Sequence, residues 1–107
     1  MPRTEALSIQ QLAEFDPKRH VSKLLHDSEK SRVVLFCLEA RQELSPHQSP
    51  SEVVFYGVEG APQILLGDER VPLSPKSLLV CPPMVPHGIA SGAGRSVVLA
   101  VITPRPA

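Results

Sequence analysis

Short apolar runs separated by turn residues make up most of the chain. The longest runs are VVLFCL at 33–38 and VVLAVI at 97–102. Twelve prolines and six glycines punctuate the chain, many of them between the apolar runs. Short apolar segments bounded by proline, glycine and polar turns are typical of β-strands and not of helical bundles. The pattern predicts an all-β domain of about eight strands, built as a sandwich, jelly roll or small barrel.

The alternation within each run predicts which side chains face the interior. The segment 32–40 needs burial on both faces, because six apolar residues follow one another within it. In 52–59, Val53 and Phe55 share one face, and Glu52 points to the other. The proline-framed stretch 41–50 is predicted to be a loop. Eight strands are expected, at 19–25, 32–40, 52–59, 63–66, 70–73, 77–81, 87–91 and 96–103.

One short helix is expected before the strands, over roughly 8–14, with Ser8 as its cap. Its apolar residues would share one side: Ile9, Leu12 and Ala13. We expect residues 1–31 to form a lead that packs on a barrel core of residues 32–103. No linker or repeat divides the chain, so the sequence predicts a single domain. The tail at 104–107 is expected to fray.

Composition and charge narrow the classes of function. The chain has 107 residues with 11 basic and 11 acidic side chains, and its aromatic residues are three Phe and one Tyr. A nucleic-acid binder shows a basic stripe and stacking aromatics, so no nucleic-acid partner is expected. No apolar run could cross a bilayer, and the first residues lack the apolar core of a signal peptide. We therefore expect no membrane partner and a cytoplasmic location, with Cys37 and Cys81 as reduced thiols.

Two proline-framed histidines carry most of the chemical signal. His47 lies in LSPHQSPSEVVFYGVEG (44–60), and His87 lies in CPPMVPHGIA (81–90). An imidazole binds metals and also serves as a hydrogen-bonding group in pockets. These residues alone leave open whether the two imidazoles form a metal site or are two hydrogen-bonded wall residues.

Other side chains that could complete a metal site have simpler interpretations. Glu52 is expected to face away from the interior, and Glu43 to lie on an exposed loop. His20 and His26 stand among charged residues, which predicts a solvated strand or turn. Met84 is predicted to be a plug or core filler and not a sulfur ligand.

The order of these segments resembles the cupins, a family of small jelly-roll barrels also called double-stranded β-helices. PHQSPSEVVFYGVEG (46–60) is similar to the first motif of that family, and SLLVCPPMVPHGI (77–89) to the second. The hairpin ILLGDERVPL (64–73) lies between them, and the resemblance spans about residues 32–103. It implies a cupin-type jelly-roll barrel that binds a small molecule between its walls. Cupins commonly pair through exposed sheet edges, so we also expect a homodimer with 19–25 at its interface.

The resemblance also implies a set of metal ligands. In metal-binding cupins the first motif supplies two histidines and a glutamate, and the second supplies one more histidine. These positions fall on His47, Ser49, Val53 and His87, so two of the four match. The usual central glycine of the second motif is Met84. A catalytic metal needs about three protein ligands and one open position.

Two functions remain open from the sequence. One is a small cupin enzyme that acts on a small organic molecule by oxygen chemistry or isomerisation. Its divalent metal (iron, manganese, nickel, copper or zinc) would be held by His47 and His87. The other is a metal-free cupin that binds or senses a small, mainly apolar ligand, with Ser49, Val53 and Phe55 beside the two histidines. One histidine retained from each motif favours the enzyme, and the serine and valine at the other ligand positions favour the binding protein.

Overall fold

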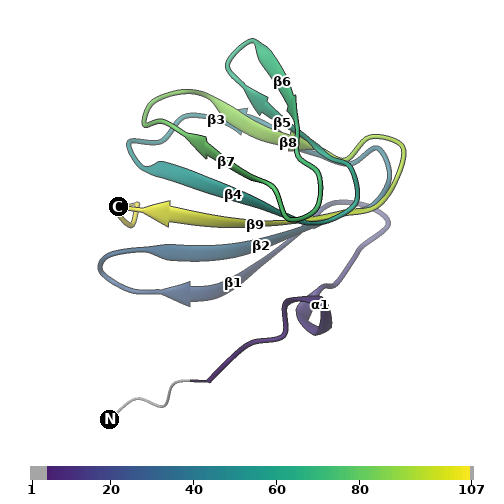
Figure 1. The fold of residues 1–107 in the computed structure, drawn as a ribbon, viewed down its shortest axis with the longest axis horizontal. Coiled ribbons are helices and arrows are strands. Elements are labelled where there is room, and N and C mark those ends of the chain that lie inside the picture. The colour runs from purple at the N-terminus through teal and green to yellow at the C-terminus, as the bar shows by residue number, and fades with distance from the viewer. Residues whose placement is uncertain (1–4, 107) are drawn as a thin grey trace.

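A computed structural model describes residues 5–106 as two antiparallel sheets and one short helix (Figure 1). The elements are α1 (Ile9–Leu12), β1 (Val21–Asp27), β2 (Arg32–Leu38), β3 (Glu43–His47), β4 (Glu52–Glu59), β5 (Gln63–Leu66), β6 (Glu69–Pro72), β7 (Leu78–Cys81), β8 (His87–Ala90) and β9 (Ser96–Thr103). The larger sheet has the order β1-β2-β9-β4-β7, and the smaller sheet has the order β3-β8-β5-β6. This arrangement confirms the predicted all-β jelly roll with one N-terminal helix. Among the described residues, no helix is long and apolar enough to cross a membrane.

The main core lies between the two sheets, because alternate residues of each strand point inward. In β4, Val53 and Phe55 are buried and Glu52 is exposed, as predicted. Their partners in this core come from strands of both sheets and from the segment after β6. These partners are Leu38, Ile64, Leu73, Cys81, Ile89, Val98 and Ala100.

The strand β2 is buried on both faces, which confirms the interpretation of its continuous apolar run. One face contributes Leu38 to the main core. The opposite face contributes Leu35 and Cys37 to a second cluster with Val97. The N-terminal lead covers this cluster with the expected side of α1 and one aromatic ring. The covering residues include Ile9, Leu12, Ala13 and Phe15.

Polar contacts hold the N-terminal lead against the barrel. The guanidinium of Arg95 lies 3.9 Å from the ring centroid of Phe15, and two hydrogen bonds of 2.9 Å join it to Glu39. The side-chain amide of Gln42 donates to the backbone oxygen of Asp16 at 2.7 Å. Such contacts add specificity to the apolar packing, since a cation over an exposed ring contributes about 0.5–1 kcal/mol.

Both cysteines are buried and occur as free thiols, as predicted. Cys37 belongs to the second cluster and Cys81 to the main core. Burial raises the pKa of both thiols above the ordinary value. They therefore act as small apolar residues.

The stretch 41–50 was predicted to be a loop, and this prediction is wrong for half of its length. Glu43–His47 forms β3, which pairs with β8 at the edge of the smaller sheet. Pro46 is tolerated there because proline occurs on edge strands, where a missing N–H need not break a ladder bond.

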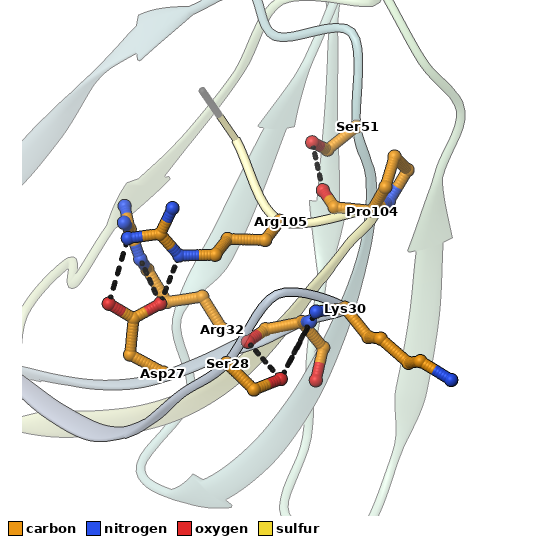
Figure 2. Close-up of polar contacts among 8 residues, drawn as sticks. Asp27, Ser28, Lys30, Arg32, Ser51, Pro104 and Arg105 are labelled. Atoms are coloured by element: carbon orange, nitrogen blue, oxygen red, sulfur yellow. Dashed lines mark hydrogen bonds and ion pairs between the residues drawn. The ribbon is translucent and has the colours of Figure 1, made fainter.

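The prediction of a frayed tail is also wrong for residues 104–106. Ser51 Oγ donates to the backbone oxygen of Pro104 at 2.6 Å (Figure 2). The Arg105 amide donates to Lys30 O at 3.0 Å. The tail is therefore fixed between the β1–β2 turn and the start of β4. Ala107 lies outside the described residues.

Candidate functional site

The two proline-framed histidines meet across the pair of strands β3 and β8. His47 is the last residue of β3, His87 is the first residue of β8, and the two are register partners. Their ring centroids are 4.6 Å apart, with the planes tilted by 56°. The fold therefore brings together two residues that lie forty positions apart in the sequence.

Gly88 allows β3 to approach β8 closely enough for this contact. A Cβ atom at position 88 would lie 2.4 Å from the backbone oxygen of Leu44 and 2.9 Å from the nitrogen of Pro46. Contacts this short would force β3 to shift. The glycine after His87 thus determines where His47 lies.

His87 is a buried imidazole whose tautomer is set by its surroundings. Its side chain is 4% exposed, and its ring centroid lies 5.9 Å from that of Phe55, edge to face. Nδ1–H donates to the backbone oxygen of Val85 at 3.1 Å, because a carbonyl oxygen can only accept. Burial lowers the pKa of His87, and this effect outweighs the bond to Val85 O, which raises it; the neighbouring His47 adds a smaller lowering. At neutral pH His87 therefore presents Nε2 as a hydrogen-bond acceptor.

His47 lies at the rim of the site and is exposed. The loop that follows it is tied to the corner between β7 and β8. Gln48 Nε2 donates to Met84 O at 3.0 Å, and the Met84 amide donates to Ser49 O at 2.8 Å. These bonds fix the rim on which His47 and Ser49 lie.

Met84 is not the plug or core filler that was predicted, and it lines neither part of the cavity described below. Its side chain is 56% exposed, and its φ of 69° lies in the left-handed region. This is the position where the cupin motif usually has glycine. A left-handed backbone favours glycine, so Met84 has a conformation that glycine would adopt at lower cost.

A cavity runs from this rim into the space between the sheets. Its outer part has a volume of about 380 Å³ and its inner part about 30 Å³. The two parts share four lining residues, namely His47, Val53, His87 and Ile102. The remaining lining of the inner part is apolar: Phe36, Leu44, Phe55 and Ala100. The inner part holds one or two waters at most, whereas the outer part lies in the size range of small-molecule sites.

All five residues that the sequence assigned to the site line this cavity. His47, Ser49, Val53 and His87 line the outer part, and Phe55 lines the inner part.

Several further lining residues were missed, among them Arg32, Gln48, Pro50 and Pro106. Strand parity could have revealed Arg32, since it shares the inward face of β2 with Phe36. The apolar run 33–38 that follows it does not alternate between apolar and polar residues, so the inward face of the strand could not be read from it.

The other candidate ligands lie outside the site. Glu52 points away from the interior, and Glu43 is exposed beside Ala90 on β8. His20 and His26 line neither part of the cavity. Across residues 5–106, no three His, Cys, Asp or Glu side chains lie close enough to hold a metal ion. Two imidazoles fall short of the roughly three protein ligands of a catalytic metal, so the residues present do not form the donor set that the resemblance implies.

Comparison with known proteins identifies the family. Residues 32–107 match the model of the AraC-like ligand binding domain, which is more than half of the chain. None of the curated proteins matches the chain in sequence.

Several solved structures have the same architecture. TT1209 from Thermus thermophilus is 28% identical with a TM-score of 0.90, over 96% of this chain and 100% of that one. An RmlC-like cupin protein from Desulfovibrio desulfuricans is 29% identical with a TM-score of 0.87, over 96% of this chain and 99% of that one. A cupin superfamily protein from Desulfitobacterium hafniense is 23% identical with a TM-score of 0.83, over 96% and 94%, and supports the fold alone. The chain therefore has the cupin fold and belongs to the AraC-like ligand-binding domain family.

Proposed function

We propose that the protein binds a small organic molecule in the cavity between its sheets, through His47, Ser49, Val53, Phe55 and His87. The observation that carries the proposal is a cavity in two parts. The outer part has a volume of about 380 Å³ and the inner part about 30 Å³, and both histidines line the two parts. An apolar pocket with a few converging polar groups is typical of small-molecule sites. The description of the family as ligand-binding supports the same function.

The polar groups at the junction offer complementary hydrogen bonds. Nε2 of the neutral His87 accepts, since Nδ1–H is already donated to Val85. Ser49 Oγ accepts from the Ser51 amide at 3.0 Å, which leaves its own hydrogen to donate. A ligand that fits this cavity would place a polar group at the junction, where it forms hydrogen bonds with Ser49 and His87. Its apolar end would lie in the inner part against Phe55.

A screen of small organic acids, alcohols and amides by NMR tests this function. Compounds that bind are expected to shift the ring signals of His47 and His87. Val53→Phe narrows the junction and should abolish those shifts. Val54→Phe adds the same ring to the outward face of β4 and should leave them unchanged. Binding that survives V53F would place the ligand elsewhere and contradict the proposal.

A second candidate is a metal held by the two imidazoles, favoured by their separation of 4.6 Å between centroids. Iron, manganese, nickel, copper and zinc all accept imidazole ligands, but this pair alone gives a weak and unselective site. Metal content per chain distinguishes the candidates, measured by mass spectrometry on protein purified without a histidine tag or chelator. Near-stoichiometric metal that is lost in a His47→Ala, His87→Ala double variant would support the metal site. Metal below that level and unaffected by the variant would argue against it.

The cellular setting and assembly state remain predictions from the sequence. The buried free thiols of Cys37 and Cys81 are compatible with the reducing cytoplasm that was expected. The expected homodimer is supported by β1, an edge strand of the larger sheet on which Leu24 is 58% exposed.

A further inference from the structure

Arg32 brings a guanidinium group to the outer part of the cavity. It begins β2 and pairs in register with Ile102 of β9, and both side chains line the cavity beside His47 and His87. Of the described residues that line this outer part, none is Asp or Glu. The lining therefore carries positive charge without a carboxylate of its own.

Asp27 does not fully neutralise Arg32, because Arg105 occupies both of its carboxylate oxygens (Figure 2). Nε and Nη2 of Arg105 lie 2.5 and 3.1 Å from these oxygens, and this pairing lowers the pKa of Asp27 to about 2. Arg32 reaches Asp27 through Nε alone, at 3.4 Å, near the upper limit for a hydrogen bond. Two guanidinium groups thus share one carboxylate, and one positive charge remains at the cavity mouth.

The terminal amino groups of Arg32 are available to a ligand. Within residues 5–106, the side-chain hydrogen bonding of Arg32 is limited to the Nε contact with Asp27. Its side chain is 30% exposed and lines the outer part of the cavity, so the guanidinium is partly shielded from bulk solvent. A guanidinium fork matches a carboxylate with two parallel hydrogen bonds, which single neutral donors cannot reproduce.

We propose that the cavity takes a small organic carboxylate, and that Arg32 binds the carboxylate group. The inference rests on the proposed function, since it names the class of ligand for the same cavity. The apolar body of the ligand lies against Val53 and Ile102, and a hydroxyl group donates to Nε2 of His87. A short hydroxycarboxylate has this combination of groups. Arg105 is a positioning residue, because it holds Asp27 and so keeps Arg32 free for the ligand.

NMR titration of the isotope-labelled full chain tests the inference. The probes are 3-hydroxybutanoate and 4-hydroxybenzoate, each beside its primary amide, which keeps the shape and loses the charge. The acids are expected to shift the Arg32 Nε–H and His87 ring signals, and the amides to bind about tenfold more weakly or worse. Arg32→Gln should reduce the affinity for the acids to that for the amides. Arg70→Gln is the matched control, since Arg70 is an exposed arginine on β6 that lines neither part of the cavity.

Two further variants separate the role of Arg32 from a loss of folding. Arg32→Lys keeps the charge and loses the fork, so its affinity for the acids should fall between those of the wild type and R32Q. Arg105→Gln should also weaken binding of the acids and not of the amides, because Asp27 is then free to pair with Arg32. Equal binding of acids and amides at His87 would overturn the role of Arg32 and leave the proposed pocket standing. No shift of His47 or His87 with any of the four probes would contradict both.

Discussion

At the scale of single residues, burial decides what His87 can do. The imidazole is enclosed by Phe55 and His47, and one of its nitrogens is committed to Val85. Burial opposes protonation because a charged ring would lose its hydration. The chemistry of the site therefore depends on a neutral ring with one free lone pair.

The lowered pKa of His87 predicts a dependence of stability on pH. The ordinary pKa of histidine is 6.5. Just below that pH, His87 is largely protonated in the unfolded chain, whereas it stays neutral in the folded protein until a lower pH is reached. The free energy of unfolding should therefore decrease as the pH falls below about 6.5, with a slope from this group of at most about 1.4 kcal/mol per pH unit. Urea unfolding between about pH 7.5 and pH 5 measures the slope. His87→Gln should flatten it, and an unchanged slope in H87Q would show that burial of His87 has no such effect.

Met84 predicts a stabilising substitution at a residue of the second motif. Its left-handed φ of 69° penalises any residue with a Cβ atom, and its exposed side chain contributes little packing. Met84→Gly should raise the free energy of unfolding by about 1 kcal/mol. Met84→Ala keeps the Cβ atom and should give no such gain. Equal effects of the two substitutions on the urea midpoint would mean that backbone conformation is not the cause.

At the scale of elements, the apolar runs predicted most of the strands. They also predicted which side chains of β4 are buried and that β2 is buried on both faces. Alternation placed Val53 and Phe55 inside, and the six-residue run required two clusters on opposite faces of β2. These features depend on local periodicity, which a single sequence contains.

Other features depend on contacts between distant segments, which periodicity does not reveal. The strand β3 looked like a loop because Pro46 lies within it, and its pairing depends on the close approach that Gly88 allows. The side chain of Arg32 reaches the cavity because β2 lies between β1 and β9, and the tail is fixed by Asp27 and Ser51. The histidine pair was expected from family resemblance, whereas the charged residues at the cavity mouth were not.

The N-terminal lead gives a prediction for folding. If residues 1–31 pack on a core of 32–103 as one domain, urea unfolding should show a single transition. Phe15→Ala removes a ring from the second cluster and from contact with Arg95, and should lower the free energy of unfolding by about 2 kcal/mol. Leu7→Ala is the control, since Leu7 is 49% exposed in the same lead. A separate early transition that F15A alone shifts would mean that the lead unfolds independently.

At the scale of the whole molecule, the segments before and after the barrel strands pack against the barrel. The lead covers the outer face of the larger sheet, and the tail supplies Pro106 to the wall of the cavity. Within residues 5–106, no further strand pairs with the outer edges of β1 and β7 in the larger sheet. An exposed edge with an apolar side chain favours pairing with a second copy.

The expected homodimer can be located with two matched charge substitutions. Leu24 on β1 is 58% exposed and Leu78 on β7 is 62% exposed, so each could lie in an interface. If 19–25 forms the interface, Leu24→Lys should convert the dimer to a monomer, and Leu78→Lys should leave it intact. Sedimentation equilibrium measures both. A wild-type protein of monomer mass, or a dimer that only L78K dissociates, would contradict this interface.

The proposed pocket is tested most directly by a crystal structure of the protein with the compound that binds most tightly in the NMR screen. We expect the compound to lie between His87, Val53 and Ile102, with one of its own acceptor atoms at Ser49 or one of its own donor groups at His87 Nε2. If the compound carries a carboxylate, that group should lie against Arg32. A compound bound outside the cavity, or a metal ion bridging the two imidazoles in place of the ligand, would contradict it.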